Sequence, residues 1–171
     1  MMKKQRYFWP AGASGVYRNS YPPLKASALR SADMRTERVI IQASTFSTHD
    51  MSTLRGWWEE DYQQTQRYYN QMLGHYGTAP AIATPELCEE VVRNHLYSNS
   101  ILCILSLQDW LSMDGKWRNP NVQEERINIP ANPRHYWRYR MHLTLEQLMK
   151  AESLNEKIRE LVKQTGRNPE K

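Results

Sequence analysis

Two short apolar runs place the tightest constraint on how this chain of 171 residues can fold. Residues 38–44 contain a β-branched stretch, and residues 101–105 are apolar at every position. Runs of this length and composition are typical of buried parallel strands. Helical patterns lie between them, and the order strand, helix, helix, strand indicates an α/β fold. Because two parallel strands cannot form a stable sheet alone, we expect the chain to be the end of something larger.

The first helical pattern comes directly after the first run. Leu54, Trp58 and Tyr62 recur at a spacing of four residues, which predicts a helix over residues 52–75. Gly74, followed by a second glycine three residues later, is expected to end this helix. The strand and the helix are therefore joined by only a few polar residues.

Two later helices carry clear signals at their N-termini. Thr84 can cap a helix, and Pro85 suits the first helical position. Thr144 and Gln147 fit a capping box, and Gly166 is a natural stop for the helix that follows. The second of these helices is the best-marked element of the chain.

The remaining segments are less regular. Residues 107–113 are expected to form one or two helical turns, and residues 114–142 are expected to be mostly loop because prolines interrupt them. Residues 1–37 show neither helical nor strand periodicity and are expected to form an irregular N-terminal arm. The sequence therefore predicts one body over residues 38–166, followed by a short tail at 167–171.

The net charge of +5 belongs to the N-terminal segment. Residues 1–40 hold eight Lys and Arg and two Asp and Glu, a net of +6. Residues 41–171 hold fifteen and sixteen, a net of −1. Because the body is nearly neutral, its charge gives little support to nucleic-acid binding.

The cysteines and the length of the apolar runs indicate in which cellular compartment the protein is expected. Cys88 and Cys103 lie in apolar patterns and are interpreted as buried free thiols of a reducing environment. No secretory leader is evident, and no run approaches the length of about 18 apolar residues that a membrane span requires. No group of His and Cys has the spacing of a metal site. We therefore expect a cytoplasmic protein without membrane contact.

Polar pairs follow both expected strands, where residues of α/β proteins face the active-site mouth. His49 and Asp50 follow the first strand, and Gln108 and Asp109 follow the second. A carboxylate in such a place can stabilise developing positive charge, and a neighbouring imidazole can donate a hydrogen bond to a hydroxyl group. The alternative for both pairs is a helix N-terminus, where Asp is favoured in any case.

Basic and aromatic residues alternate near the end of the segment over residues 125–140. Stacking rings with Arg side chains fit a surface for single-stranded nucleic acid, and rings beside polar groups equally fit a sugar-binding cleft. A third interpretation is a strand or loop with Arg outside and the rings inside.

Three motifs together resemble the C-terminal part of the 4-α-glucanotransferases, the amylomaltases or disproportionating enzymes of glycoside hydrolase family 77. They are STHDMSTLRGWWEED at 47–61, LQDWL at 107–111 and RINIPANPRHYWRYR at 126–140. The resemblance covers roughly residues 40–166 and is greatest to the branch with N-terminal starch-binding modules. It implies a (β/α)8 TIM barrel. This chain would be a C-terminal fragment of it with about two strands and their helices, mainly helical in isolation.

The resemblance also implies an activity, the transfer of α-1,4-glucan segments between malto-oligosaccharides by a retaining mechanism. Asp50 matches the carboxylate that stabilises the transition state, and His49 matches the sugar-binding residue beside it. Asn128 and Pro130 match a loop that shapes the acceptor side. No cofactor or metal ion is implied.

The nucleophile and the acid/base carboxylate of the family lie upstream, and nothing in residues 1–37 matches them. A retaining mechanism needs both groups, so we expect the isolated chain to be inactive and its partner to be the missing N-terminal part of the barrel. A broken reading frame, a split gene or a misplaced start would each produce such a chain. The alternatives are a non-catalytic module that binds glucan or single-stranded nucleic acid through residues 134–140, and a chain that does not fold stably.

Overall fold

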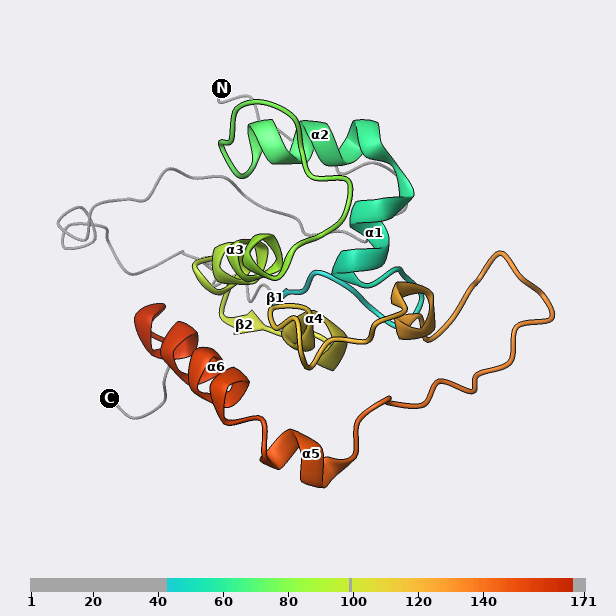
Figure 1. Cartoon of the computed structure of the whole chain (residues 1–171). Coiled ribbons are helices and arrows are strands. Elements are labelled where there is room, and N and C mark those ends of the chain that lie inside the picture. The colour runs from blue at the N-terminus through green and yellow to red at the C-terminus, as the bar shows by residue number, and fades with distance from the viewer. Residues whose placement is uncertain (1–42, 99, 168–171) are drawn as a thin grey trace, which may run out of the picture.

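The computed structural model describes residues 43–98 and 100–167. In chain order its elements are β1 (Ala43–Ser44), α1 (Leu54–Glu60), α2 (Tyr62–Gln71), α3 (Pro85–Leu96), β2 (Leu102–Cys103), α4 (Leu107–Leu111), the 3-10 helix η2 (Val122–Glu125), α5 (Leu145–Met149) and α6 (Glu152–Gln164). Figure 1 shows the two strands at the centre, with α1, α3 and α4 around them and with α5 and α6 along one edge. The described part of the chain is therefore mainly helical.

The two strands pair in parallel, with Ala43 opposite Leu102 and Ser44 opposite Cys103. The N–H of Ile104 continues the pairing by donating to the carbonyl of Ser44 at 2.8 Å. This confirms the predicted parallel pair, although β2 is shorter than the five-residue run that predicted it. Residues 38–42 of the first expected strand lie outside the described residues. The pairing brings the segments after β1 and β2 to the same end of the strands.

The helix predicted over residues 52–75 is two helices. Asp61 interrupts it with extended backbone at φ −142° and ψ 102°. Its carboxylate then caps α2 by accepting the N–H groups of Gln63 and Gln64 at 2.9 and 3.2 Å. The side chain of Asp61 competes with the helical backbone, which is why the i,i+4 pattern alone missed the break. The predicted stop is confirmed, because Gly74 has a φ of 74°.

The remaining N-terminal signals are confirmed. Thr84 caps α3, and its hydroxyl accepts the N–H of Leu87. Thr144 and Gln147 form the capping box. The prediction of one helix between Thr144 and Gly166 is wrong, because the box opens only the short helix α5 and α6 begins anew after Ala151. Gly166, with a φ of 69°, ends α6 as predicted.

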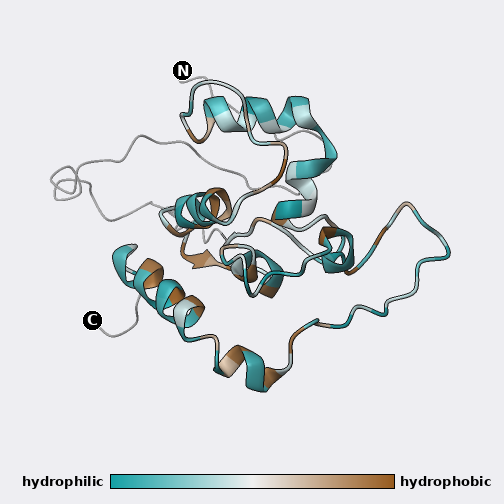
Figure 2. Cartoon of the chain, viewed as in Figure 1, coloured by the Kyte–Doolittle hydropathy of each residue, from teal (hydrophilic) through white to brown (hydrophobic). Residues whose placement is uncertain are grey.

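One apolar core joins the helices. Trp58, Leu54, Leu111 and Met113 are at most 2% exposed and are among its largest side chains. The core continues into α3 and α6, and Figure 2 shows hydrophobic residues along one side of α6. Within residues 43–98 and 100–167, no helix is long and apolar enough to cross a membrane.

The two cysteines differ in burial. Both are free thiols, Cys88 buried in α3 and Cys103 only half-buried in β2. The expectation of a buried thiol is therefore confirmed for Cys88 and wrong for Cys103, because β2 has a neighbouring strand on one side only within the described part. The expected arm over residues 1–37 lies outside the described residues.

Candidate functional site

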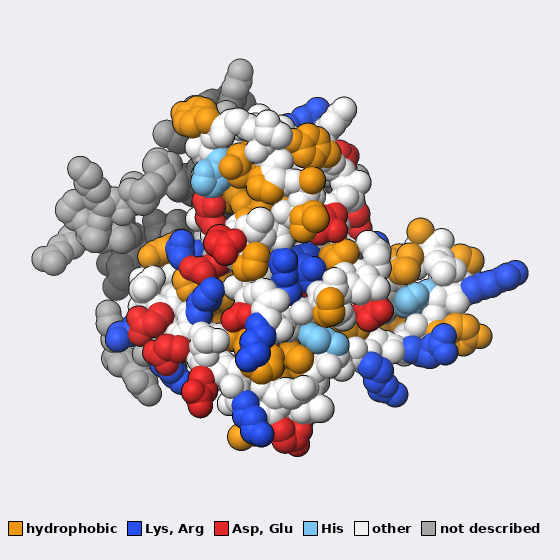
Figure 3. Space-filling model, viewed as in Figure 1, with side chains coloured by type: hydrophobic (Ala, Val, Ile, Leu, Met, Phe, Trp, Pro, Cys, Tyr) orange, Lys and Arg blue, Asp and Glu red, His pale blue; other side chains and the backbone are white. Residues whose placement is uncertain are grey.

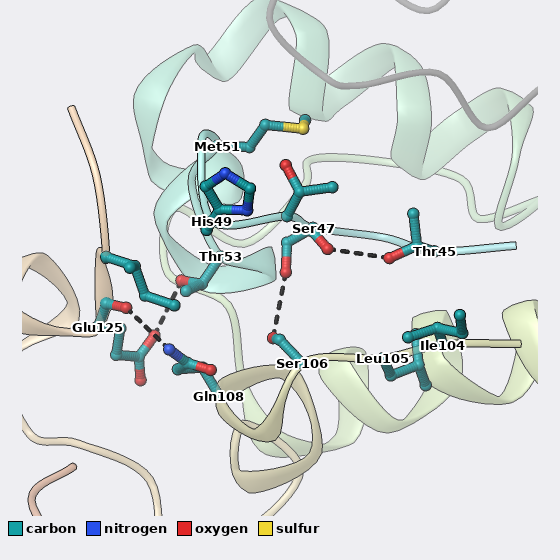
Figure 4. Close-up of a pocket in the computed structure, with 12 residues that line it drawn as sticks. Thr45, Ser47, His49, Met51, Thr53, Ile104, Leu105, Ser106, Gln108 and Glu125 are labelled. Carbon is teal, nitrogen blue, oxygen red and sulfur yellow. Dashed lines mark hydrogen bonds between the residues drawn. The ribbon is translucent and has the colours of Figure 1, made fainter. Parts of the chain in front are cut away.

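A pocket opens where the segments after β1 and β2 meet. Its volume is about 390 Å³. His49 and Thr53 line it from the β1 side, Gln108 lines it from α4, and Glu125 lines it from η2. Figure 4 shows these side chains around the pocket, with Ser47 bonded to Ser106 across its base. The predicted position at the ends of parallel strands is thus where the chain forms a cavity.

Three of the four predicted site residues contact one another beside the pocket, and of these His49 lines it. The side-chain amide of Asn128 donates to Oδ1 of Asp50 at 2.8 Å. Nε2 of His49 lies 3.2 Å from Oδ2 of Asp50. The side chains of His49 and Asp50 are about half exposed, at 57% and 52%, whereas Asn128 is buried. The carboxylate is therefore held in place and still open to a ligand.

Pro130, the fourth predicted residue, lies exposed two positions beyond Asn128. It belongs to a turn in which the N–H of Asn132 donates to the carbonyl of Ile129 at 2.8 Å. In the part of the chain that the structure describes, no group of three or more His, Cys, Asp or Glu could hold a metal ion.

A buried ion pair fixes the segment that carries Asn128. Nη1 of Arg55, in α1, donates to Oε1 of Glu125 at 2.6 Å and to the carbonyl of Asn119 at 2.6 Å. Thr53 donates to Oε2 of the same carboxylate at 2.9 Å. The side chains of Arg55 and Glu125 are only 5% and 3% exposed. This contact holds η2 against α1, three residues before Asn128.

The surroundings of Glu125 act on its acidity in opposite directions. Burial raises the pKa of the Glu125 carboxyl above its usual value, and the Arg55 guanidinium and the Thr53 hydroxyl offset part of that rise. Breaking such a pair would leave Arg55 buried and uncompensated. The sequence contained no local signal for this pair, because its partners are 70 residues apart.

The second predicted pair divides between two roles. Gln108 lines the pocket, and its amide donates to the carbonyl of Glu125 at 3.3 Å. Asp109 is fully buried; its carboxylate accepts the N–H of Leu54 at 2.9 Å and the hydroxyl of Ser47 at 2.5 Å. Asp109 therefore binds the N-terminus of α1 instead of facing the mouth.

The basic and aromatic run projects from the body between η2 and α5, and Figure 3 shows both hydrophobic and basic side chains on this projection. Tyr136 and Trp137 are 72% and 62% exposed, so the interpretation with the rings inside is wrong for these two. The ring centroid of Trp137 lies 5.4 Å from that of His49. The sequence patterns did not foresee this contact between the run and the His-Asp pair.

Comparison with known proteins identifies the family. A family model described as 4-alpha-glucanotransferase, of glycoside hydrolase family 77, matches residues 31–145. This chain belongs to the 4-alpha-glucanotransferase family. The match includes every predicted site residue, and it begins inside the segment that was expected to be the arm. The family is one of TIM-barrel enzymes.

Several 4-alpha-glucanotransferases align with the chain. It is 41% identical over 122 residues to the 4-alpha-glucanotransferase DPE2 of Oryza sativa subsp. japonica. The aligned residues make up 71% of this chain and 13% of that protein. The chain is 33% identical over 120 residues to the 4-alpha-glucanotransferase of Chlamydia muridarum, covering 67% and 21%. The enzyme of Aquifex aeolicus is 30% identical over 95 residues, covering 56% and 17%. The chain thus spans about a fifth or less of the length of these relatives.

Proposed function

We propose that this chain is the C-terminal part of a 4-α-glucanotransferase barrel and supplies its last two strands with their helices. The parallel pairing of β1 and β2, with helices making the crossover between them, supports this assignment. The small share of each relative that the chain covers supports it too. The activity of the complete enzyme would be the transfer of α-1,4-glucan segments between malto-oligosaccharides.

One observation carries the proposal: Asp50 is held by Asn128 and by His49, and His49 also lines the pocket. In a retaining transfer the transition state resembles an oxocarbenium ion. A fixed carboxylate beside the reacting carbon stabilises that charge without having to reorganise during the reaction. His49 and Asn128 would bind sugar hydroxyl groups and would also keep Asp50 in position. Pro130 would shape the acceptor side.

The isolated chain is inactive in this proposal. One stabilising carboxylate lowers the barrier only when a nucleophile and an acid act on the same glycosidic bond. Those two carboxylates would come from the missing N-terminal part of the barrel, which is the proposed partner. No cofactor or metal ion is needed for this chemistry.

A complementation assay tests the proposal. The chain is first incubated with maltotriose by itself. It is then mixed with maltotriose and a separately produced part of rice DPE2 that ends before the segment aligned with this chain. We expect glucose and longer maltodextrins from the mixture only, with α linkages in the products by proton NMR. In the mixture, Asp50→Asn should lower the rate by about 100-fold or more, because a charge-stabilising group is lost.

The control is Glu59→Gln, an exposed carboxylate of α1 outside the pocket, which should leave the rate unchanged. A mixture in which Asp50→Asn is as active as the parent chain would refute the role of Asp50. Turnover by the chain alone that is lost on Asp50→Ala would refute its incompleteness.

A non-catalytic binding module is the second candidate, and the exposure of Tyr136, Trp137 and the Arg side chains around them favours it. A single-stranded nucleic-acid ligand would lose affinity steeply as salt rises, because bound phosphates release counterions. Glucan binding would hardly respond to salt. Titrations at two salt concentrations separate the two ligands.

A further inference from the structure

We propose that Trp137 is the stacking platform for a glucosyl unit bound beside Asp50. The inference rests on the proposed function and names the residue that recognises the apolar face of the sugar. Trp137 is 62% exposed on the projecting segment, and its ring lies against His49 at 5.4 Å with 45° between the ring planes. His49 in turn lies 3.2 Å from Asp50.

Exposure alone would carry no meaning, since single apolar residues are common on protein surfaces. Tyr76, for instance, is 97% exposed, in the loop between α2 and α3. Trp137 differs because it packs on the imidazole of His49, which is open to solvent and lies beside the exposed carboxylate of Asp50. An aromatic face next to a few convergent polar groups is the general pattern of a small-ligand site.

The chemistry of this trio fits a neutral polyol. A pyranose ring has C–H groups on its faces and hydroxyl groups around its rim, so it can stack on an indole and donate hydrogen bonds to a carboxylate at once. Asp50 already accepts one bond from Asn128, but a carboxylate has about four acceptor positions. The negative charge of Asp50 disfavours phosphate groups at this position. The trio therefore selects a sugar over a nucleotide.

The projecting segment is tied to the loop that holds Asp50. Nε2 of His135 lies 2.9 Å from the carbonyl of Ile127, next to Asn128. The N–H of His135 donates to the carbonyl of Asn132 at 3.0 Å, which closes a turn just before the two exposed rings. The indole and the carboxylate are thereby held by one continuous stretch of chain.

The test is a ligand-observed NMR titration of the full chain with maltotriose, following saturation transfer from aromatic protein protons to sugar C–H protons. We expect a Kd in the millimolar range. Trp137→Ala should weaken it about tenfold through the loss of the ring. Trp137→Phe, which keeps a ring, should stay within about threefold of the parent, whereas Trp137→Leu should behave like the alanine variant. Circular dichroism and the Tm check that each variant is folded.

The matched control is Tyr76→Ala, which removes an exposed ring in the loop between α2 and α3 and should leave the Kd unchanged. Three results would each overturn the inference: a folded parent chain that shows no transfer to maltotriose, Trp137→Ala with the parental Kd, or Trp137→Leu equal to Trp137→Phe. The proposed function is judged separately by the complementation assay with Asp50→Asn. A negative complementation assay does not change the Kd values that the NMR titration measures, and a negative NMR titration does not change the result of the complementation assay.

Discussion

At the scale of single residues, Cys88 shows how burial changes chemistry. Its side chain is 1% exposed, and burial raises the pKa of the thiol from 9.0 to about 11, with the Ser112 hydroxyl offsetting part of the rise. Reactivity follows the thiolate, so the folded chain keeps this cysteine inert near neutral pH. The sequence placed Cys88 in an apolar pattern, and the structure supplies the consequence for its acidity.

Alkaline pH should destabilise the chain through Cys88. Between pH 9 and 11 the thiol of the unfolded chain ionises while the folded one stays protonated, so the unfolded state binds fewer protons. The free energy of unfolding should therefore fall as pH rises through this window, by about 2 kcal/mol from this group. Urea unfolding at pH 8.5 and 10.5 measures the fall. Cys88→Ala should remove this part of it, and an equal fall in both proteins would contradict the assignment.

At the scale of elements, helices of this chain bind one another's ends through polar side chains. Asp109 of α4 accepts the first N–H of α1, at Leu54, and also the hydroxyl of Ser47 after β1. Arg167, beyond α6, donates to the carbonyls of Leu96 and Ser98 at the end of α3. Groups that a helix leaves unsatisfied at its ends are thus paired across the molecule.

Asp109→Ala should be strongly destabilising, because it leaves the N–H of Leu54 buried without its acceptor and removes one of the two acceptors of the Ser47 hydroxyl. We expect a loss of about 3 kcal/mol in the free energy of unfolding, measured by urea denaturation. The control is Asp114→Ala, whose carboxylate accepts the N–H of Lys116 in an exposed turn and should cost at most about 1 kcal/mol. Equal losses in the two variants would show that the cross-helix cap is not what makes Asp109 important.

At the scale of the whole molecule, the strand region is left with exposed apolar side chains. Ile101, Leu102 and Ile104 are 56%, 50% and 60% exposed around β2. In a complete barrel, further strands and helices would cover such residues. β2 pairs with β1 on one side only among the described residues, and an apolar strand with an open edge is liable to pair with another chain.

Ile104→Lys should therefore reduce self-association of the isolated chain, because a charge on an open strand opposes pairing. We expect light scattering at high protein concentration to fall, with the free energy of unfolding changed by no more than about 0.5 kcal/mol. Ile82→Lys is the matched control, since Ile82 is also 60% exposed but lies in the loop before α3. Equal effects of the two substitutions would mean that the added charge, and not its place next to β2, is responsible.

The sequence by itself determined the features whose signals lie within about four residues of one another. Helix caps at Thr84 and Thr144, the glycine stops and the apolar runs that pair as strands are of this kind, since capping and periodicity are local. Three motifs together, at 47–61, 107–111 and 126–140, also pointed to the family. Even locally, the break at Asp61 escaped the helical pattern, because one side chain outcompeted the helical backbone.

Only the tertiary structure decided the contacts that make the site. The bond between Asn128 and Asp50 joins residues 78 positions apart, and the pair of Arg55 and Glu125 joins residues 70 apart. The packing of Trp137 against His49 is equally remote in the chain. Such contacts depend on how the helices and strands pack, and they leave no periodicity or spacing in the sequence. For that reason the sequence pointed to the carboxylate of Asp50, and only the fold showed that Asn128 holds it and that Trp137 lies against the neighbouring His49.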